Sequence, residues 1–547
     1  MKSHSSVLRD FTVDRRVWLM SAIAIIIGVG AALLAVVLLK AIALATNIFY
    51  YHRLSMQSVG PAGSPLGYWM PIVPIVGGLI VGLMARFGSD KIRGHGIPEA
   101  IEAILLNGAK VEPSIAVLKP ISAAISIGSG GPFGAEGPII MTGGAFGSLI
   151  AQWVHLTDAE RTTLLVAGAA AGMAATFSAP LSAILLGVEL LLFEWRPRSL
   201  IPVACASITA EIVRVLLLGS GPLFAMPSMP FQQSASVCVL ALLLGLGVGI
   251  AAAALSRLMY GFEDLFERMP VHWMWWPAIG GIGIGIGGLF FPRGLGVGYD
   301  NIAELLRGSA PLGLLLGLII AKSLMWAFSL GSGTSGGVLA PLLMIGGALG
   351  ELAAHAAHAS APQQALWAAV AMGGMLAGSL GVPLTAIIFM LEITRSLPVL
   401  LPVMLGCLAA YTVTSLIMPR SILTEKLSRR GYHLTREYGI DPLEIVTIAE
   451  IMGDVTPEEC EPAKTLLPDV FIYSDETSRA AVEKMAAASL TSLFVVDRES
   501  DKVCGKVGLS DLLLGRLRLM QRESQRSRIF GFMRHRPGPP ATPKVGV

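Results

Sequence analysis

The sequence predicts an all-α polytopic membrane protein with two internal repeats and discontinuous helices, followed by a small α/β cytoplasmic domain. Three observations lead to this prediction. The 547 residues are 54% hydrophobic and only 14% charged, and their mean hydropathy is +0.68. The chain matches itself without gaps when it is shifted by 203 residues, the separation of Pro138 and Pro341. Finally, glycine and proline interrupt many apolar stretches before a full membrane span is complete.

The composition excludes several classes of function. A chain this apolar must be solvated largely by membrane lipid, and it is not a soluble enzyme. The net charge of +3 is too small to indicate a nucleic-acid partner. None of the five cysteines forms a CxxC pair, so neither a disulfide framework nor a metal site is expected. No nucleophile elbow, phosphate loop or metal-spaced His/Cys cluster indicates an enzyme.

The apolar run Val17–Leu39 is long enough to cross a bilayer and is expected to be retained in the mature protein. Under the positive-inside rule, the basic residues that precede it fit the cytoplasmic side. Both termini are expected in the cytoplasm, and the membrane is expected to be a bacterial-type inner membrane. The domains expected are a cytoplasmic N-terminal segment (1–16), a membrane domain (17–430) with repeat halves at about 68–200 and 271–417, a cytoplasmic domain (441–520), and a basic, then proline-rich disordered tail (521–547).

The repeat places the most distinctive motifs of the two halves in register. The segment from Pro138 to Ala145 aligns with the segment from Pro341 to Ala348, and Glu189 aligns with Glu392. A duplication of about 200 apolar residues is typical of transport folds whose site lies between the two halves. Paired interruptions in corresponding halves predict discontinuous helices that meet near the middle of the membrane.

Three glycine-rich breaks each end in proline and then open an apolar helix. They are Gly94-His95-Gly96-Ile97-Pro98, Gly134-Ala135-Glu136-Gly137-Pro138 and Gly337-Val338-Leu339-Ala340-Pro341. Proline suits the first helical position, and glycine leaves the preceding backbone N–H groups unobstructed. Three such helix starts converging would bind an anion through backbone donors and helix dipoles. For any single glycine, close helix packing is the better explanation, and it is the matched prolines and the repeat that favour a site for the set.

Two lysines and one carboxylate complete this prediction. Lys119 and Lys322 lie nine residues before matched Gly-Ser-Gly motifs and would add positive potential, although snorkelling to the interface is the alternative. Glu136 stands where the second repeat has Leu339, so a negative charge can occupy the position of the anion itself. We therefore expect Glu136 to be a gate that blocks the path when ionised. The alternative is a carboxylate that only stabilises the helix dipole.

Together these motifs resemble the CLC family of chloride channels and proton-coupled anion exchangers, over about Val17 to Arg430. The family signatures are usually Gly-Ser-Gly-Ile-Pro, Gly-Arg-Glu-Gly-Pro and Gly-x-Phe-x-Pro, and the three breaks match them in order and spacing. The resemblance implies a homodimer with one anion pathway per subunit, inverted halves, chloride as the bound ion, no required cofactor, and Glu136 as the external gating glutamate.

Three departures from the family pattern bear on anion binding and proton coupling. His95 stands where a serine hydroxyl usually faces the central anion, and Leu423 stands where a tyrosine hydroxyl usually does. His95 can donate an N–H to the anion, or it can point away and only pack. Leu190 stands where proton-coupled members carry a second, internal glutamate. Glu194 could substitute for that glutamate, but an interfacial charge is the simpler interpretation, and Glu189 and Glu392 are interpreted as helix-terminal structural carboxylates.

The expected function is therefore passage of chloride or a similar small monovalent anion. Leu190 favours channel-like flux, and proton-coupled antiport by a non-standard internal route is the alternative. A cation-coupled transporter of organic solutes would instead need carbonyl-rich breaks and embedded acids. A nucleotide sensor that is merely anchored in the membrane would not need duplicated helix starts.

The polar C-terminal part predicts a helix near Glu476–Ala488 and strands at Ser492–Val496 and Val503–Leu509. Thr477 to Leu514 resembles one unit of a CBS module, with Asp511 at the position of the ribose-binding aspartate. This resemblance implies an adenine nucleotide as a candidate ligand of the tail. The segment from Ile448 to Pro468 resembles only a fragment of a partner unit.

Overall fold

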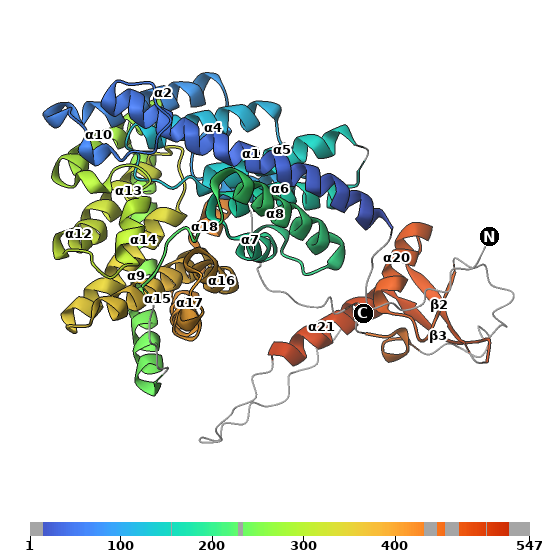
Figure 1. The fold of residues 1–547 in the computed structure, drawn as a ribbon. Coiled ribbons are helices and arrows are strands. Elements are labelled where there is room, and N and C mark those ends of the chain that lie inside the picture. Colours follow the sequence, from blue (N-terminus) through green and yellow to red (C-terminus); the bar gives the residue numbers. More distant parts are fainter. Residues whose placement is uncertain are drawn as a thin grey trace. The chain divides into compact units, whose positions relative to one another are not determined.

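The computed structural model describes residues 15–154, 156–227, 234–431, 443, 446–453, 470–498 and 500–524. Contacts divide the chain into two compact units, Met1–Arg436 and Glu437–Val547. The first is an all-helical membrane unit and the second is a small α/β unit (Figure 1). The predicted N-terminal segment, apart from residues 15 and 16, lies outside the described residues.

The membrane unit is built from eighteen described α-helices, with π-helical turns at η4 (Gly187–Leu192) and η7 (Leu318–Lys322). The helices are α1 (Arg16–Tyr51), α2 (Ile72–Phe87), α3 (Ile97–Leu106), α4 (Pro113–Gly128), α5 (Glu136–Trp153), α6 (Asp158–Phe177), α7 (Pro180–Leu186), α8 (Pro197–Leu218), α9 (Ala235–Glu267), α10 (Trp276–Phe290), α11 (Tyr299–Leu305), α12 (Leu312–Gly317), α13 (Ser323–Gly331), α14 (Leu339–Ala356), α15 (Ala361–Leu380), α16 (Pro383–Thr394), α17 (Leu400–Ile417) and α18 (Ile422–Arg429).

The repeat in the sequence is a repeat in the structure. Helices α5, α6, α7 and α8 begin 203 residues before α14, α15, α16 and α17, respectively, as the bounds above give. Packing repeats as well: α5 packs on α6 as α14 packs on α15, and α6 packs on α8 as α15 packs on α17. The prediction of two related halves with discontinuous helices is confirmed.

Contacts between the halves are reciprocal, which is the signature of a two-fold relation. The Glu189 carboxylate accepts hydrogen bonds from the backbone N–H groups of Leu384 (3.2 Å) and Thr385 (2.8 Å) at the start of α16. In return, the Glu392 carboxylate accepts from Leu181 and Ser182 (both 2.8 Å) at the start of α7. Each carboxylate thus caps a helix of the opposite half, as the structural interpretation of both glutamates requires.

The repeat extends further than the sequence indicated. Helix α1 packs on α8 as α9 packs on α17, so α1 and α9 are also equivalent. They begin at Arg16 and Ala235, which are not 203 residues apart. The predicted start of the halves, near residues 68 and 271, therefore missed the first helix of each half, because the loops that follow these helices differ in length. The first half also continues to Leu218 rather than ending near residue 200.

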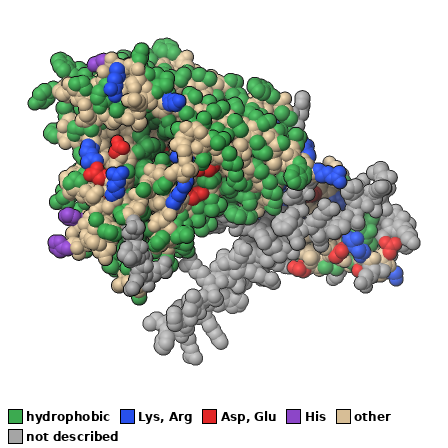
Figure 2. All heavy atoms as spheres, viewed as in Figure 1, with side chains coloured by type: hydrophobic (Ala, Val, Ile, Leu, Met, Phe, Trp, Pro, Cys, Tyr) green, Lys and Arg blue, Asp and Glu red, His purple; other side chains and the backbone are tan. Residues whose placement is uncertain are grey.

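The surface of the membrane unit suits lipid. Within the described ranges, eight helices are long and apolar enough to cross a membrane. Figure 2 shows hydrophobic side chains over most of the visible face of this unit, with charged side chains in a few places. In contrast, α14 is mostly enclosed by other helices, with 72% of its apolar window buried. It is therefore an interior helix, and its first residue, Leu339, is buried.

The second unit is a three-stranded sheet with two helices. Strands β1 (Phe471–Tyr473) and β2 (Ser492–Asp497) are parallel and are joined through α20 (Ser478–Ala488), while β3 (Lys502–Gly508) pairs antiparallel with β2. Buried apolar side chains, including Ile472, Met485 and Val495, form its core. The predicted helix and the two predicted strands are confirmed, but β1 was missed because its three residues carry no clear periodic signal.

The last helix, α21 (Leu509–Ser524), corrects one boundary. It continues four residues into the segment that was expected to be disordered, because Gln521, Arg522 and Glu523 are all favourable helix formers. The rest of that tail, 525–547, lies outside the described residues, as does 454–468 of the expected partner fragment. Asp511 accepts a hydrogen bond from the Gly508 N–H (2.8 Å) and so caps this helix.

The reciprocal caps predict matched losses of stability. Replacing Glu392 or Glu189 by alanine leaves two backbone donors without their acceptor, so each variant should lower the free energy of unfolding by about 1–2 kcal/mol. Thermal unfolding in detergent measures this loss. The control is Glu112→Ala, which removes a solvent-exposed pair with Lys91 and should cost less than about 0.5 kcal/mol. Unchanged unfolding of both cap variants would contradict the structural role.

Candidate anion site between the repeats

The three predicted breaks meet at the buried centre of the membrane unit. The breaks before α5 and α14 pair with each other: Gly337 N–H donates to Gly134 O (2.8 Å) and Gly134 N–H donates to Gly337 O (3.3 Å). These two glycines are repeat mates, so this short antiparallel bridge lies on the two-fold relation between the halves. The chain therefore crosses itself where both helix starts, Glu136 and Leu339, face the same region.

Close backbone approach explains why glycine occupies these positions. A Cβ on Gly137 would overlap the carbonyl oxygen of His95, and a Cβ on Gly96 would lie 2.8 Å from the carbonyl oxygen of Gly137. Gly96 also has φ +89°, a conformation that strains any other residue. The break before α3 is thus packed directly against the break before α5. Both explanations offered for the glycines apply, since tight packing is what brings the helix starts together.

Not every backbone donor in the breaks is available to a ligand. Glu99 accepts a hydrogen bond from Gly96 N–H (2.9 Å), and its other oxygen binds the Lys426 ammonium (3.0 Å). Gly94 N–H donates to Gly333 O (3.2 Å). The expectation that glycine leaves these particular N–H groups unobstructed is therefore wrong at Gly94 and Gly96. The sequence analysis did not identify Glu99, although its position three residues after Gly96 is typical of a capping box.

Glu136 lies at the meeting point and is fully buried, with 0% exposure. Its carboxylate folds back over Gly134, and its Oε2 would lie 2.5 Å from a Cβ on Gly337. The backbone N–H groups of Glu136 and Ala340 interact with it electrostatically, although neither carboxylate oxygen makes a hydrogen bond of good geometry in the described structure. A negative group thus occupies the position that amides from both halves face.

His95 and Leu423 are both buried. Neither ring nitrogen of His95 has a hydrogen-bond partner among the described residues. Leu423 lies near the start of α18, which packs on α3 and α15. Buried polar groups without partners are rare and mark strain, function or a missing ligand. His95 therefore provides a buried side-chain donor two residues before the start of α3.

The two matched lysines hold equivalent loops. The Lys119 ammonium donates to the carbonyl oxygens of Ile92 and Gly94 (both 2.8 Å), and the Lys322 ammonium donates to those of Gly294 (2.9 Å) and Gly296 (3.0 Å). Both side chains have 0% exposure. The alternative that they snorkel to the interface is therefore wrong. Each buried charge is bound by loop carbonyls and fixes the chain that leads into a helix start.

The region of Leu190 contains two other carboxylates, and both are engaged. Glu189 caps α16, as described above. Glu194 accepts a hydrogen bond from the Ser199 hydroxyl (2.5 Å) and pairs with Arg196 (3.4 Å) and Arg198 (3.6 Å). Its side chain is 27% exposed. This arrangement fits the interpretation of Glu194 as an interfacial charge.

Sequence reasoning missed a fourth break, Gly296-Val297-Gly298-Tyr299, which precedes α11. It is the repeat mate of Gly94-His95-Gly96-Ile97 at an offset of 202 rather than 203, as the numbering shows. Gly296 N–H donates to Gly130 O (3.1 Å), as Gly94 N–H donates to Gly333 O. Allowing one deletion in the repeat would have found it. Tyr299 therefore lies in the region of the site, although no sequence motif indicated this.

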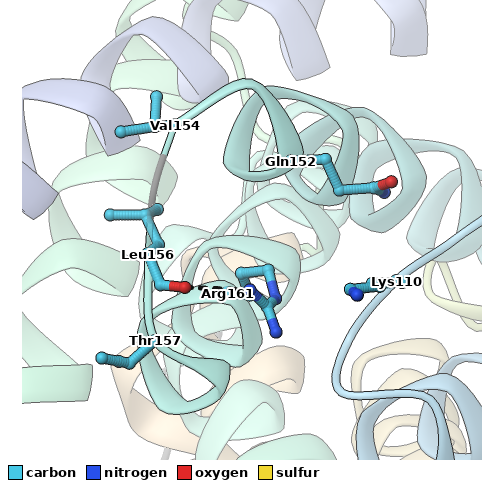
Figure 3. A pocket seen from close by; sticks show the side chains of 6 residues that line it. All are labelled: Lys110, Gln152, Val154, Leu156, Thr157 and Arg161. Atoms are coloured by element: carbon cyan, nitrogen blue, oxygen red, sulfur yellow. Dashed lines mark hydrogen bonds between the residues drawn. The ribbon is translucent and has the colours of Figure 1, made fainter.

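A cavity lies at the periphery (Figure 3). It has a volume of about 570 Å³ and is lined by Lys110, Gln152, Val154, Leu156, Thr157 and Arg161. Arg161 donates hydrogen bonds to Leu156 O (2.9 Å) and Gly108 O (3.1 Å), so its guanidinium fixes the surrounding loops. None of the predicted site residues lines this cavity, and the candidate site remains the meeting point of the helix starts.

Comparison with known proteins gives a consistent result. The model of the voltage gated chloride channel family matches residues 76–415. The chain is 30% identical over 424 residues to the H(+)/Cl(-) exchange transporter ClcA of Citrobacter koseri, covering 74% of this chain and 87% of that protein. It is 31% identical over 364 residues to chloride channel protein CLC-f of Arabidopsis thaliana, covering 61% of this chain and 45% of that protein.

A solved structure shows the same fold. The crystal structure of a slow cyanobacterial Cl-/H+ antiporter superposes with a TM-score of 0.67 at 22% identity, over 77% of this chain and 99% of the other. The match to the family model covers more than half of the present chain and includes the three helix starts and both lysines. The chain therefore belongs to the CLC family of chloride channels and exchangers, whose members transport anions across membranes.

Proposed function

We propose that the protein passes chloride or a similar small monovalent anion between the two repeats, along the meeting point of the helix starts, and that Glu136 gates this passage. The observation that carries the proposal is the position of the Glu136 carboxylate, which is buried and faced by backbone amides of α5 and α14. Amides that face one negative group can also stabilise another.

The gate follows from competition for the same donors. When it is ionised, the carboxylate of Glu136 holds the position that an anion needs, and the path is closed. When it is protonated, it loses the charge that the amides favour, so an incoming anion can displace it. No full cationic side chain is needed at this position, which suits an ion that must leave as readily as it enters. Lys119 and Lys322 add positive potential from behind the loops that they fix.

Two modes of transport remain, and different observations favour each. Channel-like flux is our first proposal, because Leu190 replaces the internal proton-carrying glutamate and both neighbouring carboxylates are engaged in caps and ion pairs. Proton-coupled antiport is the second, because several relatives are named as H(+)/Cl(-) exchangers. Chloride efflux from proteoliposomes with simultaneous proton recording tests both. Chloride flux without proton movement supports a channel, and fixed-ratio counter-movement supports an exchanger.

We also propose the oligomeric state and the membrane location of the protein. A homodimer in a bacterial-type inner membrane, with both termini in the cytoplasm, agrees with the family resemblance. Leu181 of α7 and its repeat mate Leu384 of α16 are 50% and 52% exposed, which leaves a matched apolar surface for a second subunit. Adenine nucleotide binding by the C-terminal unit stays a proposal as well, and the Asp511 carboxylate already caps α21 there.

Glu136→Gln should transport chloride with most of the pH dependence removed, because the amide cannot ionise and so cannot close the path. The measurement is initial chloride efflux as a function of pH. The matched control is Glu351→Gln, a second fully buried carboxylate about three turns along α14, which accepts a hydrogen bond from Ala310 N–H (2.9 Å). The control should keep the wild-type response. A wild-type pH profile for Glu136→Gln would refute the gate.

His95→Ser should change the preference between anions more than the total rate, because it exchanges one neutral donor for another of different reach. We expect the chloride-to-nitrate flux ratio to change by about threefold or more, the size of a modest hydrogen-bond difference. The exposed His355 supplies the control, since His355→Ser should leave the ratio unchanged. Identical selectivity in both variants would place the His95 imidazole outside the path.

A further inference from the structure

Tyr299 carries an unexplained polar group near the gate. Its hydroxyl oxygen is buried and has no hydrogen-bond partner among the described residues. Native structures rarely leave such a group unsatisfied, because its desolvation is not compensated. Other buried tyrosines in the membrane unit do find acceptors: Tyr50 donates to Ser129 O (3.0 Å) and Tyr260 donates to Ile422 O (2.5 Å). The Tyr299 hydroxyl is thus a buried donor that has no acceptor among the described residues.

The surroundings of Tyr299 fix the direction of this donor. The residue opens α11 directly after Gly298, whose φ of +76° turns the chain. The edges of Phe177 and Phe224 pack against its ring, with centroid separations of 6.3 Å and 6.0 Å. Both phenylalanines are buried. These two ring contacts restrict the movement of the Tyr299 ring and so hold its hydroxyl oxygen in place.

The gate itself is a complementary group within electrostatic range of this donor. Tyr299 interacts electrostatically with Glu136, and both carboxylate oxygens of Glu136 also lack a hydrogen-bond partner of good geometry. One buried donor and one buried acceptor, each unsatisfied, therefore lie within electrostatic range of each other. The other charged group that faces Glu136 in the described structure is Lys322, and its ammonium is already bound by two loop carbonyls.

We propose that Tyr299 is a positioning residue for the gate: its hydroxyl donates a hydrogen bond to the carbonyl oxygen of the protonated Glu136 side chain when that side chain swings away from the amides of α5 and α14. The inference rests on the proposed function, since it needs Glu136 to be a moving gate. It supplies the second position that such a gate requires. It also explains why two adjacent polar groups are left unpaired in a single conformation.

This pairing predicts a direction for the pH response. A hydrogen bond that forms only with the protonated, displaced side chain favours protonation, so losing the bond makes Glu136 take up its proton at a lower pH. Protonation opens the path. The pH of half-maximal chloride flux should therefore move downward in Tyr299→Phe, by about one pH unit, which corresponds to a tenfold change in the protonation equilibrium. Phenylalanine keeps the ring between Phe177 and Phe224, so the fold should persist.

The experiment compares four proteins in proteoliposomes: wild type, Tyr299→Phe, Glu136→Gln and the double variant. Tyr299→Phe should shift the flux profile in the wild-type background and have no further effect in the Glu136→Gln background. The matched control is Tyr50→Phe, which removes a buried hydroxyl that already has an acceptor and should leave the midpoint in place. Thermal unfolding of each variant separates a loss of fold from a change in the gate.

The outcomes separate this inference from the function beneath it. An unshifted midpoint in Tyr299→Phe, with wild-type protein still transporting chloride under control of Glu136, would overturn the role of Tyr299 alone. Equal effects of Tyr299→Phe in both backgrounds would also overturn it, because the hydroxyl would then act independently of the carboxylate. Absence of chloride flux in wild-type protein, or an unchanged pH profile in Glu136→Gln, would overturn the proposed function first.

Discussion

Backbone N–H groups buried away from water must find acceptors, and at the centre of this membrane unit that requirement shapes everything around it. Gly134 and Gly337 satisfy each other in a short antiparallel bridge, which fixes the two halves of the chain at their closest approach. Because each glycine lies two residues before a helix start, the bridge also directs two helix starts at one region. The backbone N–H groups of Glu136 and Ala340 face that region, and the Glu136 carboxylate interacts with them.

The same requirement explains the reciprocal contacts elsewhere. Helices that begin inside the protein cannot use water as a cap, so carboxylates of the opposite half supply it, from Glu189 to α16 and from Glu392 to α7. Buried lysines play the complementary part at Lys119 and Lys322, where loop carbonyls need donors. Because the sequence is duplicated, each of these two kinds of contact occurs once in each half. Among the described residues, His95, Glu136 and Tyr299 are three whose buried polar side-chain atoms have no hydrogen-bond partner.

Much of this could be predicted from the sequence, since gapless identity at one offset places Gly134 with Gly337 and Glu189 with Glu392. Positions with a period-breaking residue, such as Pro138 and Pro341, also mark helix starts directly. Other features carry no local signal. The one-residue deletion before α11 hid Tyr299, and unequal loops hid the equivalence of α1 and α9. Whether His95 faces a helix start depends on packing between segments far apart in the chain, which spacing alone does not encode.

The central claim is that amide-bearing helix starts from both halves bind a permeating anion at the place where Glu136 now sits. The most direct measurement is an anomalous-scattering structure of Glu136→Gln protein in bromide, because bromide replaces chloride and identifies itself. The account predicts a bromide peak beside the break at residues 134–138, within reach of backbone N–H groups of α5 and α14. A peak absent from this region, or a cation bound there instead, would contradict it.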